Sequence, residues 1–74
     1  MSTVSRYLII VEPTATGFSA YSPDVPGCVA TGRTPVDVER EMREAVAFHL
    51  DGLREDGQPV PRPSAAAAYV DVAA

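Results

Sequence analysis

The segment from Thr34 to Gly57 constrains the fold most, because it carries the signals of one long amphipathic helix. Thr34 suits the N-cap, Pro35 suits the first helical position, and Asp37 sits where an acid can bind free backbone amides. Apolar side chains then recur every three or four residues and form one face, made of Val38, Met42, Ala45, Val46, His49 and Leu53. The sequence predicts a helix over residues 35–55, whose apolar face needs a surface to cover it.

Three short segments that precede this helix are typical of β-strands. Residues 6–12 form a nearly uninterrupted apolar run, as in a strand buried on both faces at the centre of a sheet. Residues 17–22 alternate, with Phe18 and Ala20 on one face and Ser19 and Tyr21 on the other, and residues 28–31 are a short third strand. Turn-forming residues separate these segments, so an antiparallel meander is predicted.

The part of the chain after the helix predicts one more strand. Alternating prolines in residues 58–63 favour an extended linker. Residues 68–72 then alternate like a strand, which a right-handed crossover would place parallel to the first strand. The predicted fold class is therefore α+β, a single β-β-β-α-β domain over residues 1–74. Its sheet combines the antiparallel meander with a C-terminal strand parallel to strand 1, in the order 3-2-1-4, and one helix packs on one face.

The small size of the chain predicts self-association. A domain of 74 residues buries a modest share of its surface, and such scaffolds usually need a disulfide, a metal or a partner. Cys28 is the only cysteine and His49 the only histidine, which excludes an internal disulfide and argues against a structural zinc site. We expect no metal or cofactor, and a dimer or tetramer.

Net charge narrows the classes of partner. Ten carboxylates and six arginines, with no lysine, give a formal charge of −4. An acidic domain repels phosphate backbones, so no direct nucleic-acid binding is expected, while a basic protein partner is favoured. The longest apolar run, residues 7–11, is too short to cross a bilayer, and no secretory leader pattern is visible. Neither membrane association nor export is expected, and the predicted location is the cytoplasm.

Two residues in one turn, Asp24 and Cys28, invite a catalytic interpretation. A structural role is favoured for both residues. Cys28 is predicted to be a small buried hydrophobe, because free cysteine is among the most buried residue types. Asp24 is predicted to cap the turn through its own backbone amides, and Gly27 to supply a permissive backbone conformation.

An enzyme would need one of two arrangements. Either Glu12, Asp24 and Asp71 would meet around a metal ion, or Cys28 would be exposed beside His49. No phosphate-binding glycine loop, Ser-His-Asp set or metal-ligand spacing is present. The protein is therefore predicted not to be an enzyme.

Several short motifs occur in the order found in a known family. The run from Ser22 to Cys28 (SPDVPGC) precedes Thr31 to Thr34 (TGRT) and a helix that carries Glu39. This pattern, with the proline run after the helix, resembles the HicB-like antitoxins of type II HicAB toxin–antitoxin systems, over roughly residues 7–72. Within it, the family motif is expected to form a structural turn made of Asp24, Pro26, Gly27, Cys28 and Gly32.

The resemblance implies a fold and a partner. It implies a partial ribonuclease-H-like domain without catalytic acids, equivalent to the N-terminal domain of the family. It also implies an antitoxin that binds and neutralises a HicA-like toxin, a small basic ribonuclease, by covering its active site. Since the sequence stops at Ala74, no DNA-binding domain is expected. The alternative is an orphan homo-oligomeric domain with a structural or ligand-sensing role and no toxin partner.

Three aromatic residues are candidates for the interface, because exposed aromatic groups commonly anchor one. They are Tyr21, Phe48 and Tyr69. Phe48 falls away from the apolar face of the helix; packing under a loop or against a strand is slightly favoured for it over a contact with a second chain. If Phe18 and Ala20 face the helix, Tyr21 lies on the uncovered face of the sheet, which would suit a dimer or a toxin.

Overall fold

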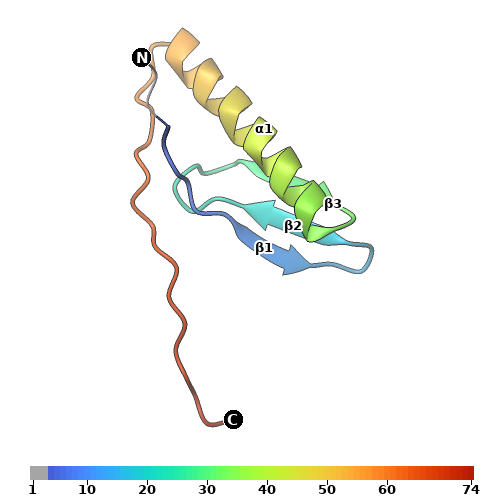
Figure 1. The fold of residues 1–74 in the computed structure, drawn as a ribbon. Coiled ribbons are helices and arrows are strands. Elements are labelled where there is room, and N and C mark those ends of the chain that lie inside the picture. The colour runs from blue at the N-terminus through green and yellow to red at the C-terminus, as the bar shows by residue number, and fades with distance from the viewer. Residues whose placement is uncertain (1–3) are drawn as a thin grey trace.

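The fold is an antiparallel sheet of three strands followed by one helix (Figure 1), in a computed structural model that describes residues 4–74. The strands are β1 (Ile10–Pro13), β2 (Phe18–Tyr21) and β3 (Val29–Gly32), in the order β1-β2-β3. The helix α1 (Pro35–Glu55) packs on one face of the sheet. The α+β class and the three-stranded meander are confirmed.

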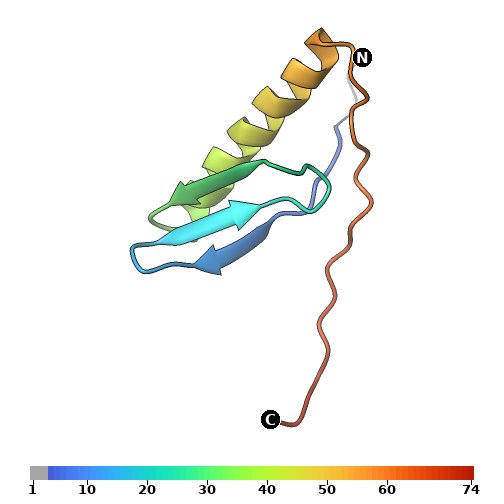
Figure 2. The same cartoon turned by 180° about the vertical axis from the view of Figure 1, so that it is seen from behind.

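Strand register divides the side chains of the sheet between two faces. Val11, Ala20 and Ala30 lie opposite one another across the three strands, and Ala20 is part of the core beneath the helix. The next row, Ile10, Tyr21 and Val29, therefore points to the other face. Seen from behind, the sheet lies in front of the helix, and no other helix or strand of residues 4–74 covers this second face (Figure 2).

The core is formed mainly by the helix and the segment between β2 and β3. Its buried residues are Ala20, Val25, Cys28, Val38, Met42, Val46 and Leu50. Leu50 was not included in the predicted apolar face but is buried, whereas His49 and Leu53 are half-buried at its margin. The buried face of the helix is thus rotated slightly from the predicted one, toward Leu50 and away from His49 and Leu53.

Both ends of α1 are capped by local hydrogen bonds. The hydroxyl of Thr34 accepts a hydrogen bond from the backbone N–H of Asp37 at 3.1 Å. At the other end Gly57 adopts a φ of +68°, and the N–H of Gln58 donates to the carbonyl of Leu53 at 2.8 Å. These caps stop the helix and send the chain into the proline-rich segment.

The helix leans toward one side of the sheet. It packs most extensively on β3 and least on β1. Gly32 permits the close approach to β3, because a Cβ there would lie 2.5 Å from the backbone nitrogen of Val38. On the face of the sheet that the helix covers, β1 is consequently the least covered strand.

The predicted fourth strand is not formed. Residues 58–74 run extended without joining the sheet, so in the described part of the chain the order 3-2-1-4 does not occur. β1 was predicted at the centre of the sheet but lies at its edge, and it begins at Ile10 rather than near residue 6. The physical reason lies in the hydrogen bonds that hold residues 61–65.

Candidate protein-binding surface

The motif turn between β2 and β3 closes one end of the core. The Ser22 hydroxyl donates to the carbonyl of Leu8 at 2.8 Å, which ties the turn to the segment before β1. Within the turn, the N–H of Val25 donates to Ser22 and that of Cys28 donates to Val25, each at 3.2 Å. These bonds place the fully buried Val25 side chain in the core.

Gly27 and Cys28 have the structural roles that their residue types suggest. Gly27 adopts a φ of +83°, in the left-handed region that favours glycine. Cys28 is buried, and burial raises the pKa of its thiol. A thiol that is held protonated and shielded from solvent is a poor nucleophile.

Asp24 does not cap its own turn in the described structure, so that prediction was wrong. Its carboxylate instead accepts hydrogen bonds from the backbone N–H of Ala65, the backbone N–H of Ser64 and the Ser64 hydroxyl, each at 2.9 Å. The amide of Ala65, then that of Ser64, lowers the pKa of Asp24, with the hydroxyl assisting and partial burial opposing. The motif acid therefore anchors a segment that is 40 residues distant in sequence.

A second anchor lies close to the first along the C-terminal segment. The Tyr7 hydroxyl donates to the carbonyl of Pro61 at 2.6 Å. Together the two anchors hold residues 61–65 against the segment before β1 and against the motif turn. They carry the chain past the end of the sheet and not along β1 (Figure 1), which explains why no fourth strand forms.

An apolar row lies on the open face of the sheet. Ile10, Tyr21 and Val29 are neighbours across the three strands, and Tyr21 and Val29 are 44% and 69% exposed. Tyr21 lies opposite the helix-covered face, as expected if Phe18 and Ala20 face the helix. This row could contact another polypeptide.

Phe48 lies on the outer surface of α1 and is 82% exposed. The favoured interpretation, packing under a loop or against a strand, was therefore wrong. Glu44 lies four residues from Phe48, and Glu41 and Glu55 each lie seven residues from it, so all three share its side of the helix. These acids are exposed and form no ion pair with another described residue, in contrast to Asp51, which pairs with Arg54.

We call the surface formed by Glu41, Glu44, Phe48 and Glu55 the acidic helix face. It combines an exposed aromatic ring with carboxylates whose charge no neighbouring arginine neutralises. An aromatic anchor surrounded by charges of one sign suits a partner that carries the opposite charge.

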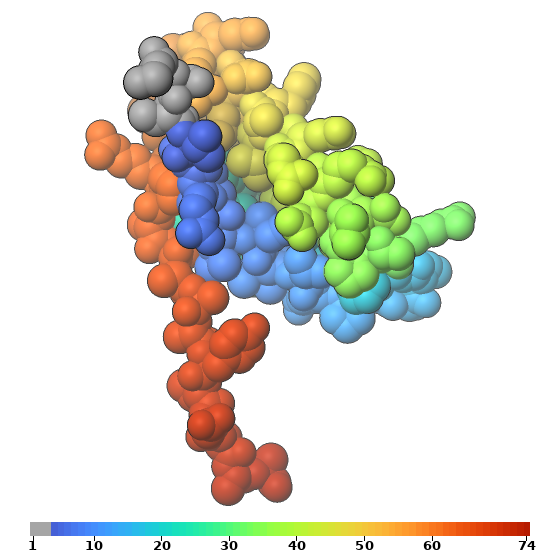
Figure 3. All heavy atoms as spheres, viewed as in Figure 1, coloured from blue at the N-terminus to red at the C-terminus, as the bar shows by residue number. Residues whose placement is uncertain are grey.

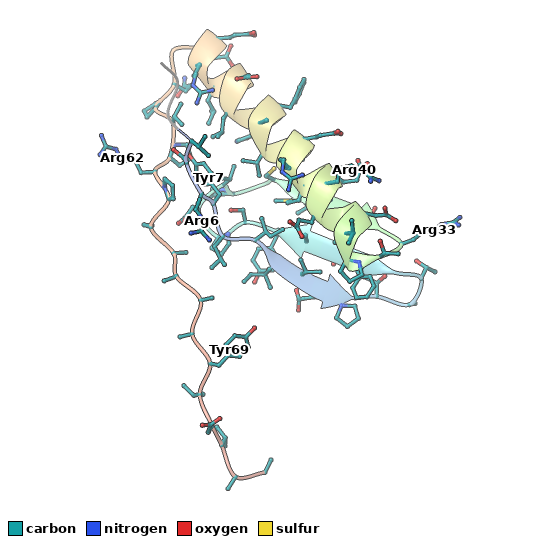
Figure 4. All side chains as sticks on the ribbon, viewed as in Figure 1. Arg6, Tyr7, Arg33, Arg40, Arg62 and Tyr69 are labelled. Atoms are coloured by element: carbon teal, nitrogen blue, oxygen red, sulfur yellow. The ribbon has the colours of Figure 1, made fainter. Side chains whose placement is uncertain are left out.

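Tyr69 projects from the C-terminal segment and is 99% exposed (Figure 4). Tyr21, Phe48 and Tyr69, the three predicted interface candidates, therefore come from three separate surfaces: the open sheet face, the acidic helix face and the C-terminal segment. The structure does not bring them into one site.

Neither arrangement that an enzyme would need is present in residues 4–74. No three histidine, cysteine, aspartate or glutamate side chains lie together as a metal site would require, so Glu12, Asp24 and Asp71 do not converge. Cys28 is buried and not exposed beside His49. The one helix of this part of the chain falls short of the length and apolar character that a bilayer span needs.

Sequence reasoning missed the residues that hold the C-terminal segment. Tyr7 was assigned only to an apolar strand, Ser22 was named only as the start of a motif, and Ser64 was given no role. A Ser64 that follows three alternating prolines, together with an acid in a turn, was the available signal. Their pairing across 40 residues could not be derived from spacing alone.

Comparison with known families gives one match that covers nearly the whole chain. Residues 7–73 match the model of the HicB-like antitoxin of bacterial toxin–antitoxin systems. Among curated relatives, an uncharacterized 14.9 kDa protein from the rep-hol intergenic region of Haemophilus phage HP1 is 32% identical over 65 residues, covering 88% of this chain. The chain spans about half the length of that relative, 49%. The UPF0150 protein Ta0767 of Thermoplasma acidophilum is 25% identical and is matched over 88% of its length.

Two solved structures share the fold. A chain of the HicA3 and HicB3 toxin–antitoxin complex superposes with a TM-score of 0.70 at 37% identity, covering 80% of this chain and 70% of that one. The crystal structure of the antitoxin HicB3 gives a TM-score of 0.66 at 38% identity, over 77% of this chain and 42% of that one. At 37% and 38% identity, the resemblance to these two structures extends from the fold to the sequence, which indicates common ancestry.

Proposed function

This chain belongs to the family of HicB-like antitoxins, and we propose that it binds and neutralises a small, basic, HicA-like ribonuclease toxin by covering the toxin's active site. The observation that carries the proposal is the combined match to the antitoxin family over residues 7–73 and to a chain of a solved HicA3–HicB3 complex. The function requires binding alone, and the described residues assemble no metal-binding cluster.

Charge supports a basic partner. The chain carries a net charge of −4, and an active site that binds RNA has to be positive. A carboxylate-rich surface can occupy the positions that phosphates would take and can also speed the encounter of the two proteins. The interaction is proposed for the cytoplasm, where a ribonuclease toxin would meet cellular RNA.

We propose that the acidic helix face makes this contact. Phe48 supplies a rigid apolar anchor, while Glu41, Glu44 and Glu55 supply charge that is not already neutralised within the described chain. The open sheet face around Tyr21 is apolar and matches a positively charged surface less well. The helix is also well held by the core, so it presents these side chains with little loss of conformational entropy on binding.

The test is purification of the protein together with the product of an adjacent small basic reading frame. We expect a stable complex and loss of the partner's ribonuclease activity. Phe48→Asp should weaken the complex at least tenfold, measured by calorimetry, whereas Tyr21→Asp, a matched change on the other face, should leave affinity within threefold. Absence of a complex and of ribonuclease inhibition would contradict the function; loss of binding by Tyr21→Asp alone would move the contact to the open sheet face.

Self-association and the absence of DNA recognition are part of the same proposal. A small domain with an exposed apolar row gains stability from a second copy, so we propose a dimer or tetramer. We propose neutralisation by binding only, with no DNA recognition by these residues. A stable homo-oligomer that has no toxin partner would favour the alternative, an orphan structural or ligand-sensing domain.

A further inference from the structure

The edge strand β1 and the segment before it have the composition of a central strand. Tyr7, Ile9 and Val11 face the helix side and Leu8 and Ile10 face the other side. Strands that are apolar on both faces normally have a neighbour on each side. Here β1 pairs with β2 alone, which leaves its outer backbone groups unpaired within the described chain.

A groove lies beside this open edge. Its volume is about 660 Å³, and it separates residues 5–11 from the helix, where α1 leans away toward β3. The face shown in Figure 3 includes the N-terminal segment and the helix that border the groove. Its walls include the apolar side chains of Tyr7, Ile9, Val11, Met42, Val46 and Leu50. The groove thus has the place and the lining that a fourth strand beside β1 would need.

Residues 66–74, which we call the C-terminal arm, have the sequence of such a strand but no partner. Tyr69, Val70 and Val72 are 99%, 82% and 76% exposed. In Figures 1 and 2 the arm leaves the end of the sheet and continues away from it, on the side opposite the helix. The groove beside β1 of the same chain opens on the helix side.

The sequence does not favour a tight turn that would bring the arm back to its own sheet. Ser64 and Ala65 are fixed to Asp24, and the four residues from Ala65 to Ala68 are alanines without the glycine, proline, asparagine or aspartate of tight turns. A groove on an adjacent molecule is therefore the accessible partner.

We propose that the C-terminal arm of one copy docks as a β-strand on the open edge of β1 in a second copy, and that the second copy returns its own arm. Reciprocal exchange forms a closed twofold dimer. Val70 and Val72 enter the groove, because the opposite orientation would bury the carboxylate of Asp71. Tyr69 then lies on the open face, next to the apolar row of Ile10, Tyr21 and Val29. This inference specifies the self-association proposed above and does not depend on a toxin.

The first test measures the mass of the isolated protein by light scattering after gel filtration. We expect the native chain to have twice the chain mass, and the variant Val70→Asp/Val72→Asp to have the mass of one chain. The control Ala67→Asp/Ala73→Asp adds the same charge to the outward side of the arm and should remain dimeric. A monomeric native chain, or a dimer that survives the valine substitutions, would overturn the proposal.

The second test locates the arm by disulfide trapping in a Cys28→Ala background. One copy carries Ile9→Cys and a differently tagged copy carries Val70→Cys. We expect oxidation of the mixture to give a covalent heterodimer, while Ala74→Cys in place of Val70→Cys should cross-link at least fivefold less. If both cysteines in one chain give only an intramolecular disulfide, the arm occupies its own groove and the exchange is wrong. Toxin binding by the monomeric arm variant separates this failure from failure of the antitoxin function.

Discussion

The segment from the motif turn to the end of the helix and the segment that follows it use their apolar residues in opposite ways. Residues 22–57 direct Val25, Val38 and Met42 into a core where each is fully buried. The arm beyond Ala65 carries Tyr69, Val70 and Val72, all exposed. Apolar content is therefore no guide to which segment is packed within one chain. The first segment has its packing partner close in sequence. The second is held by polar anchors, which direct it away from the groove beside β1.

The largest expected effect comes from the packed segment. Met42→Ala removes a fully buried side chain from the middle of the helix and should lower the free energy of unfolding by about 2–5 kcal/mol. For so small a domain this is a large part of the total stability. Urea denaturation followed by circular dichroism measures the loss. Phe48→Ala, a truncation on the exposed side of the same helix, should change stability by less than about 0.5 kcal/mol. Equal losses for the two variants would contradict the assignment of the core.

A pair of glycines provides a smaller effect with opposite signs. Gly27→Ala should cost about 1–2 kcal/mol, because the φ of +83° is unfavourable for a residue with a Cβ even though no atom obstructs it. Gly52→Ala lies within α1, where a Cβ meets nothing within 4 Å, and should stabilise by about 0.5–1 kcal/mol. The two unfolding midpoints should therefore move in opposite directions. A stabilised Gly27→Ala protein would show that the motif turn is not fixed by this glycine.

Much of the packed segment followed from its local sequence. The caps at Thr34 and Gly57, the apolar spacing along the helix and the Pro and Gly residues of the turns all act within a few residues of one another. Leu50 lay outside the predicted apolar face. Helical spacing shows which residues share one face of the helix, but it does not show which edge of that face the sheet covers. The edge position of β1 and the missing fourth strand could not be predicted in this way. They depend on Asp24 bonding to Ser64 and Ala65, and on Tyr7 bonding to Pro61, contacts whose partners are distant in sequence.

The candidate site followed the same division. The sequence identified Tyr21, Phe48 and Tyr69 as possible contacts from residue type alone. It could not separate them, because burial depends on which face of the sheet the helix covers. The unneutralised charge around Phe48 also depends on side-chain pairing, since Asp51 is paired with Arg54 while Glu44 is not paired with any described residue.

The smallest expected effect concerns the junction of the two segments, where Asp24 holds the arm. The pKa of Asp24 is lowered because its ionised form accepts hydrogen bonds from the amide of Ala65, the amide of Ser64 and the Ser64 hydroxyl. A group whose pKa falls on folding adds stability above its unfolded pKa and loses that contribution as pH falls through its folded pKa. Neutral solutions should therefore keep the anchor, and acidification below the usual range of aspartate should release it.

Amide signals of Ser64 and Ala65 in NMR spectra recorded from pH 7 downward measure this release. Both should shift with a common midpoint below the ordinary pKa of aspartate, while amides in α1 that lack acidic neighbours stay constant. Asp24→Asn should remove the titration and increase hydrogen exchange at both amides already at pH 7, because the carboxamide cannot accept all three bonds in the ionised geometry. Asp71→Asn, which changes an exposed acid within the arm, should leave both signals unchanged. If the Ser64 and Ala65 signals titrate equally in the Asp24→Asn protein, another group holds the arm, and its direction away from β1 must have a different cause.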